Sequence, residues 1–250
     1  MSVGERGRRR AAVALVLSPF LLAPFALLVS TAASSAAQAP VEEGRRLYLA
    51  HCASCHGEAG TGTAQAPGIL GLGPAAYDFQ LSTGRMPLAR PGVQPFRKPP
   101  VFSKAEMDAL IAYLTSLAPG GVPIPQVDPS AGDLSEGQAI YQANCAACHG
   151  ATGIGGAVGR GYAPDLFRAT PTQVAEAVRV GPGAMPNFGP DVIPEERLDS
   201  LVRYVLYLRE PSDRGGAGLG HVGPIVEGFV GILAGLGALV AVSRFAGERS

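Results

Sequence analysis

The residues with the clearest chemistry form two C-x-x-C-H motifs, Cys52–His56 and Cys145–His149, which contain all four cysteines of the 250-residue chain. In such a motif the two thiols can add across the vinyl groups of a haem, and the adjoining histidine is held where its ring reaches the iron. A single C-x-x-C pair would leave zinc as an alternative. Because the motif occurs twice, each time followed by glycine, we favour haem. The predicted attachment residues are Cys52, Cys55, Cys145 and Cys148, and the predicted iron ligands beside them are His56 and His149.

The sixth ligand of each iron is predicted by elimination, because low-spin electron carriers usually add a methionine or a second histidine. Of the other histidines, His51 abuts the first motif and His221 adjoins an apolar segment. Apart from the initiator, Met107 lies in a predicted amphipathic helix, where packing is the expected role. Met86 and Met185 remain, each followed by proline in a Gly/Pro-marked loop. Closed His/Met ligation leaves no iron position for substrate, which favours electron transfer over catalysis and predicts no catalytic residue.

Other residues are candidates for contacts around each haem. A ligating histidine usually donates its second ring N–H to a carbonyl, and Pro67 and Pro164 are placed to supply one, although ordinary loop prolines are the alternative. Haem propionates pair with cationic side chains, which otherwise simply face water. The cationic candidates are Arg85, Arg97 and Lys98 in the first half and Arg160 and Arg168 in the second.

The two motifs lie in the two copies of an imperfect internal duplication. Gly44 and Tyr48 precede the first motif at the spacing at which Gly137 and Tyr141 precede the second. Each copy also ends in a stretch with apolar residues at helical spacing, so each is predicted to open and close with a helix. The paired closing stretches are Asp108–Leu117 and Asp199–Leu208.

Start and stop signals delimit the closing helices. Ser103 and Glu106 have the spacing of a capping box, and Pro194 followed by two glutamates suits a first turn. Pro119 and Pro211 then end the helices. The sequence therefore predicts an all-α chain with two small domains. The predicted segments are an export segment over 1–39, domains over 40–119 and 134–211 joined by a linker over 120–133, a Gly-rich linker over 212–221, a transmembrane helix over 222–243 and a tail over 244–250.

Composition agrees with a protein built around prosthetic groups. With 34 glycines, 22 prolines and 6% aromatic residues, the chain is poorly equipped to form a large apolar core of its own. Its 20 basic and 20 acidic residues balance, so nothing suggests a nucleic-acid partner or a strongly steered acidic substrate. No cysteine is left over for a disulfide framework.

Two apolar segments predict export and membrane attachment. Four arginines precede an apolar run over about 11–33 that ends in small residues, which is typical of a cleaved signal peptide or a retained N-terminal anchor. The stretch over 222–243 is apolar enough for a transmembrane helix, the alternative being a buried helix of a soluble domain. Basic residues precede the first apolar segment and follow the second. The positive-inside rule then puts the C-terminus in the cytoplasm and the haem domains outside the plasma membrane.

These residues resemble class I cytochrome c domains, and the whole chain is similar to the dihaem cytochrome c subunit of the actinobacterial menaquinol–cytochrome c reductase, the cytochrome bcc complex. The segment after the second domain is the most discriminating, because soluble cytochromes have no reason to carry it. Departures from the family are Gly150–Thr152 after the second histidine and the lack of an aromatic belt residue near Val242. The matching motifs are Thr83–Pro87, Arg97-Lys98, Tyr162–Pro164, Gly181-Pro182, Met185-Pro186 and Gly215–Gly228.

The resemblance implies a dihaem electron carrier within a translocating quinol–cytochrome c oxidoreductase. Electrons would pass from a Rieske iron–sulfur protein to one haem c, then to the other, then to an aa3-type oxidase, with cytochrome b as a further partner. The main alternative is a dihaem subunit of a cbb3-type oxidase or of a dehydrogenase. A dihaem peroxidase or a thiosulfate-oxidising cytochrome would need an open or cysteine-ligated iron, which the predicted ligands do not provide.

Overall fold

The computed structural model describes residues 38–90, 95–159, 161–211 and 224–247, and most of these are helical. The predicted export segment up to residue 37, the Gly-rich linker over 212–221 and the tail from residue 248 lie outside the described residues. Two compact units are present: one comprises the described residues up to Gly71 together with Val101–Gly120, and the other comprises Leu72–Pro100 and the described residues from Gly121 onward.

In the first unit a helix over 38–51 crosses α4 (Lys104–Leu117) at a glycine. A Cβ atom on Gly44 would lie 1.9 Å from the Ala109 carbonyl oxygen, so only glycine permits this approach. One turn later the rings of Tyr48 and Tyr113 pack with their centroids 5.5 Å apart. The predicted capping box at the start of α4 is confirmed, because Ser103 and Glu106 exchange side-chain and backbone hydrogen bonds.

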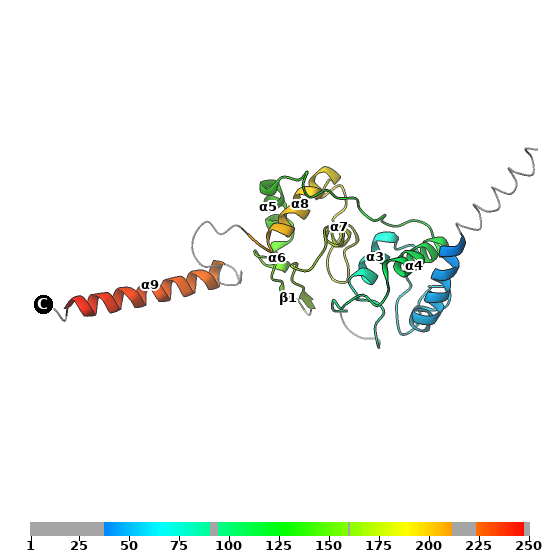
Figure 1. Cartoon of the computed structure of the whole chain (residues 1–250), viewed down its shortest axis with the longest axis horizontal. Coiled ribbons are helices and arrows are strands. Elements are labelled where there is room, and N and C mark those ends of the chain that lie inside the picture. Colours follow the sequence, from blue (N-terminus) through cyan, green and yellow to red (C-terminus); the bar gives the residue numbers. More distant parts are fainter. Residues whose placement is uncertain (1–37, 91–94, 160, 212–223, 248–250) are drawn as a thin grey trace, which may run out of the picture. The chain divides into compact units, whose positions relative to one another are not determined.

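In the second unit α5 and α8 lie side by side and repeat this crossing (Figure 1). A Cβ on Gly137 would lie 1.9 Å from the Ser200 carbonyl oxygen, and the Tyr141 and Tyr204 rings have centroids 5.4 Å apart. The duplication predicted from sequence is therefore confirmed as a duplicated helix crossing. The remaining elements of this unit are α6 (Ala146–His149), β1 (Gly156–Val158), β2 (Gly161–Ala163) and α7 (Pro171–Val180), with α5 over Leu134–Asn144 and α8 over Glu195–Tyr207.

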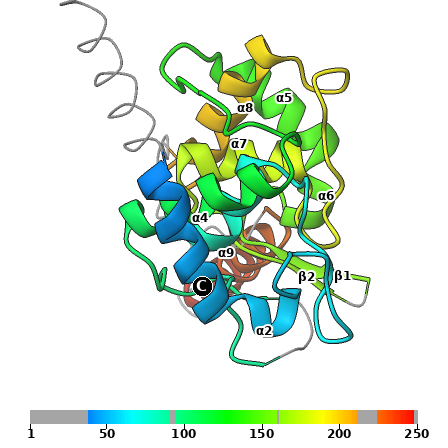
Figure 2. The same ribbon diagram turned by 90° about the vertical axis from the view of Figure 1, so that its right-hand side faces the viewer.

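The antiparallel pair β1–β2 was not predicted from the sequence. Its register pairs Gly156 with Ala163 and Val158 with Gly161, which makes a short hairpin between the second C-x-x-C-H motif and α7 (Figure 2). With three residues in each strand, the pair does not alter the all-α class of the chain.

The segment Leu72–Pro100 belongs to the first sequence copy but to the second compact unit. It contains α3 (Pro74–Ser82), which packs against α7. The Ala75 amide donates to the Val122 carbonyl at 3.0 Å, and Gly73 and Gly121 approach so closely that a Cβ on either would meet backbone at about 2.3–2.4 Å. The compact units therefore follow tertiary contacts rather than the limits of the two copies.

The C-terminal helix α9 (Pro224–Gly247) is long and apolar enough to cross a membrane, judged by length and composition. Its described side chains are exposed or half-exposed, as expected for a helix that would meet lipid rather than a protein core. The helix continues to Gly247, four residues past the predicted end at 243, because no helix-breaking residue interrupts it there. This apolar helix is consistent with membrane anchoring.

Candidate haem sites

Each C-x-x-C-H motif forms one turn of helix. The first cysteine is the N-cap of α2 (Ala53–His56) in one motif and of α6 in the other, and a glycine with φ of 80° or 75° ends each turn. Burial raises the pKa of the Cys52 thiol to about 11 and that of Cys145 to about 12, with the second cysteine of each motif adding to the effect. Apolar surroundings of this kind suit a thioether bond. Among the described residues no group of three or more His, Cys, Asp or Glu could hold a metal, so a zinc donor set is not present there.

The histidine of each motif is oriented by a backbone carbonyl. His56 Nδ1 lies 2.8 Å from the Pro67 carbonyl oxygen, and His149 Nδ1 lies 3.0 Å from that of Pro164. Since a carbonyl oxygen only accepts, each Nδ1 must carry the proton, which leaves Nε2 as the lone-pair nitrogen for iron. The two predicted proline contacts are confirmed. Burial lowers the pKa of His149, which keeps its imidazole neutral.

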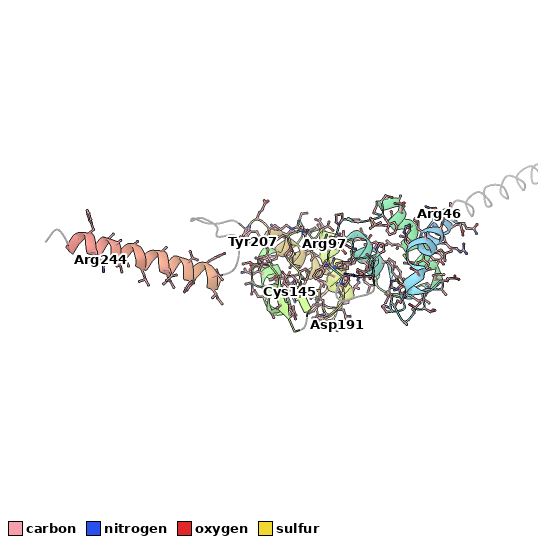
Figure 3. The ribbon with its side chains drawn as sticks, turned by 90° about the horizontal axis from the view of Figure 1, so that it is seen from below. Arg46, Arg97, Cys145, Asp191, Tyr207 and Arg244 are labelled. Atoms are coloured by element: carbon pink, nitrogen blue, oxygen red, sulfur yellow. The ribbon has the colours of Figure 1, made fainter. Side chains whose placement is uncertain are left out.

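The predicted residues of the second site line one cavity. It encloses about 1370 Å³ of empty space, part of it open to solvent, and Cys145, Cys148, His149 and Met185 all contribute to its walls. Cys145 is labelled in Figure 3. The rest of the cavity wall is mainly apolar and includes Leu201 and Val205 of α8. Two thiols, a histidine with a free Nε2, a thioether and apolar walls fit a covalently attached haem.

Met185 reaches this cavity from a tight loop after α7. Gly181 ends α7 in the left-handed conformation, with φ of 66°, and a Cβ there would lie 2.5 Å from the Asn187 amide nitrogen. The Phe188 amide donates to the Val178 carbonyl at 2.7 Å, which closes the loop. Backbone hydrogen bonds and a close glycine approach therefore fix the loop that carries Met185.

The predicted residues of the first site are divided between the two compact units. Cys52, Cys55 and His56 are half-buried in the first unit, whereas Met86 is half-buried in the second. Its amide donates to the Gln80 carbonyl at 3.0 Å, so the loop is anchored to α3. The structure does not place Met86 relative to His56, and its pairing with the first iron stays a prediction.

Residues of the first copy line the cavity of the second, namely Phe79, Gln80, Arg85, Pro95 and Arg97. The Arg85 guanidinium carbon lies 4.8 Å from the centroid of the Phe79 ring. The sequence identified both arginines as propionate candidates but gave no sign that they would face the second site. Of the remaining cationic candidates, Lys98 donates to the Pro87 carbonyl, Arg168 is largely exposed beside Asp165, and Arg160 lies outside the described residues.

Two family models match the chain, one on each copy. The model described as "Cytochrome c" matches residues 41–118, and the model described as "Cytochrome C oxidase, cbb3-type, subunit III" matches residues 132–205. The chain thus contains two cytochrome c domains, as the sequence predicted. A haem c cofactor follows from that domain type.

Curated proteins match nearly the whole chain. The cytochrome bc1 complex cytochrome c subunit of Mycobacterium tuberculosis is 36% identical over 227 residues, covering 87% of this chain and 81% of that protein. The proteins of the same name from Mycobacterium leprae and Corynebacterium diphtheriae are 36% and 34% identical, covering 83% and 85% of this chain and 75% and 82% of their own. The chain therefore belongs to the family of cytochrome bc1 complex cytochrome c subunits.

Proposed function

We propose that the chain is a dihaem electron relay, with one haem c at Cys52 and Cys55 and another at Cys145 and Cys148. The observation that carries the proposal is the single cavity shared by Cys145, Cys148, His149 and Met185. His149 and Met185 would be the axial ligands of one iron, and His56 and Met86 those of the other. When bound, haem c supplies a one-electron Fe(III)/Fe(II) couple.

The residues of the chain would hold that couple rather than perform chemistry of their own. The Pro164 carbonyl fixes the His149 tautomer, so that Nε2 is available without loss of a proton. The backbone-closed loop at Gly181 holds Met185, and the apolar walls exclude water. With both axial positions taken, no site for a substrate remains at the iron, which suits a carrier rather than an enzyme acting alone.

The proposed partners follow from the family. Electrons would enter from a Rieske iron–sulfur protein and leave to an aa3-type cytochrome c oxidase, with cytochrome b in the same complex. The α9 helix would anchor the chain in the plasma membrane, with the haem domains outside and the C-terminus in the cytoplasm. Arg244 in the last turn of α9 and Arg249 beyond it in the sequence support this orientation.

A subunit of a cbb3-type oxidase is the second candidate, because a family model with that description matches residues 132–205. That match covers one domain of a type found in many electron carriers. The relatives from bc1 complexes match both domains and the region beyond them, at 87% of the chain. The bc-complex assignment is therefore the stronger proposal.

Haem counting tests the central part of the proposal. Pyridine-haemochrome analysis of the purified full chain should give two covalent haems, and replacing either cysteine pair by alanine should remove one. One haem in the intact chain, or bound zinc, would contradict it. Purification in mild detergent should also recover a cytochrome b and a Rieske protein, whereas recovery with oxidase or dehydrogenase subunits alone would favour the second candidate.

A further inference from the structure

We propose that Arg97, assisted by Arg85, binds the propionate groups of the haem attached at Cys145 and Cys148, so that the first cytochrome domain supplies the anion-binding wall of the second domain's haem site. This inference rests on the proposed function, because it needs that haem. Both arginines line the second cavity and both belong to the second compact unit (Figure 3 labels Arg97).

The Arg97 side chain is held in place through Gln173, which lines the same cavity. Its Nη2 donates to Gln173 Oε1 at 2.7 Å, and the Gln173 amide group donates in turn to Ser82 Oγ at 3.0 Å. Gln173 is also the capping-box residue of α7, so it is itself fixed through Thr170. The guanidinium of Arg97 therefore has one nitrogen committed to Gln173 and further N–H donors free for another acceptor.

The backbone that carries Arg97 is equally constrained. The Lys98 amide donates to the Thr83 carbonyl at 3.1 Å. Gly84, with φ of 65°, lies so close to the backbone at Lys98 that a Cβ on Gly84 would lie 2.2 Å from the Lys98 carbonyl oxygen. These contacts fix the backbone at Lys98, next to Arg97. The position of Arg97 is therefore determined by its backbone as well as by its side-chain hydrogen bond.

The charges around Arg97 lack a matching anion among the described residues. Arg85, Arg168 and Arg209 each lie near enough to Arg97 to interact with it electrostatically, and Asp165 supplies the one opposing carboxylate among these interactions. Burial, and then the neighbouring arginines, lower the pKa of Arg97, and burial likewise lowers that of Arg85. Buried nitrogens of Arg85 and Arg209 have no hydrogen-bond partner within the part of the chain that the structure describes. Buried unpaired guanidinium groups are costly, so this cluster is suited to hold an anion.

The ligand chemistry is that of a carboxylate, which arginine can bind through two parallel N–H···O bonds. The haem proposed for this cavity would carry two such carboxylates, its propionates. A small oxyanion from solution, such as phosphate, has the same chemistry and is the alternative source. Occupancy by a solution anion would depend on phosphate concentration, whereas occupancy by a haem propionate would not. The experiment below uses this difference.

The test is a redox titration of the full-length chain loaded with both haems. A cation near the iron favours the reduced form, so Arg97→Gln should lower the potential of one haem. We expect about a tenfold shift in the oxidised-to-reduced ratio at a fixed potential, equivalent to about 59 mV for a one-electron couple. Arg85→Gln should act in the same direction with smaller size, and Arg97→Lys should restore most of the potential. Arg90→Gln, on the same loop but exposed, is the matched control and should change neither haem.

A second chain, Cys145→Ala with Cys148→Ala, assigns the effect to one haem. In that chain Arg97→Gln should leave the remaining potential unchanged. Equal shifts of both haems, or no shift in a chain that retains two haems, would overturn the inference while leaving the proposed function intact. A wild-type potential that follows phosphate concentration would identify a solution anion and would also overturn it. A chain with fewer than two haems would instead contradict the proposed function.

Discussion

The two cytochrome domains share the helix crossing that presents the C-x-x-C-H motif but differ in the surroundings of the motif itself. In both, a glycine lets two helices touch and a tyrosine follows one turn later. His149 and Cys145 are buried, whereas His56 and Cys52 are only half-buried. The duplication therefore preserves the helix crossing around each motif, while the surroundings of the two motif histidines differ. If each histidine binds a haem iron, as proposed, these surroundings would determine its reduction potential.

The region after the histidine carries much of the difference. In the second domain it forms the β1–β2 hairpin, whereas in the first the Thr63 hydroxyl donates to the Cys55 carbonyl and the Thr63 amide to that of Ala66. In addition, arginines of the first domain line the second cavity. On these grounds we expect the two haems to have different potentials.

The largest test of this comparison is removal of each methionine. Met185→Ala and Met86→Ala should each abolish one sulfur-to-iron absorption band in the far red and lower one potential, by a sizeable part of the roughly 0.8 V range that axial ligands control. Met107→Ala is the control, since Met107 is buried in α4 and should cost stability while both bands remain. Retention of both bands in either ligand variant would refute that ligand.

The shared crossing predicts equal sensitivity of the two domains to a single methyl group. Gly44→Ala and Gly137→Ala each place a Cβ 1.9 Å from a carbonyl oxygen of the facing helix. The cost should reach or exceed about 3 kcal/mol, the upper end of ordinary overpacking. Denaturant unfolding of the haem-loaded chain measures it. Gly156→Ala, where the nearest atom lies at 3.9 Å, should cost far less, and a tolerated Gly44→Ala would show that the two helix crossings differ.

The helices and contacts around each C-x-x-C-H motif could be predicted from the sequence, because the signals for them are local and most occur in both copies. The glycine and tyrosine spacing, the capping box at Ser103 and the two proline carbonyls all lie within a few turns of a motif or helix start. Each signal either occurs in both copies or has a known stereochemical role, as the capping box does. It can therefore be recognised in one sequence without an alignment.

The wall of the second cavity could not be predicted in the same way. The bond from Arg97 to Gln173 joins residues 76 apart, and no periodicity or turn signal relates two such positions. The packing of α3 on α7 is likewise a tertiary contact between two copies that look independent in sequence. Short strands such as β1, with three residues, are also too brief to show alternation.

Where α3 contacts α7, the second compact unit contains a buried acid. Glu176 is fully buried, and burial, together with the Asp78 carboxylate, raises its pKa to about 9. The folded chain then holds a proton that the unfolded chain releases above its ordinary pKa near 4.5. Stability should therefore fall as pH rises between about 5 and 9, by up to about 1.4 kcal/mol per pH unit.

Glu176→Gln should flatten that slope, because the glutamine amide is neutral and does not titrate in this pH range. Unfolding free energies of the haem-loaded chain, measured across this range, give the slope directly. Glu58→Gln, at an exposed position, serves as the control and should leave the slope as in the parent chain. An unchanged slope in Glu176→Gln would mean that the buried carboxyl is not the titrating group.

The smallest expected effect tests whether the tyrosines perform the same task in both domains. Tyr48 donates to the Gly57 carbonyl at 2.6 Å and Tyr141 to that of Gly150 at 2.7 Å, so each ties the helix before the motif to the glycine that ends it. Phenylalanine at either position should cost about 1 kcal/mol, since ring packing is kept while one buried carbonyl loses its donor. Tyr113→Phe, which keeps its ring contact with Tyr48, is the control. If only Tyr141→Phe destabilises the chain, the tyrosine hydrogen bond contributes to stability only in the second domain, where the motif histidine is buried. The two helix crossings would then differ in energy although their geometry is the same.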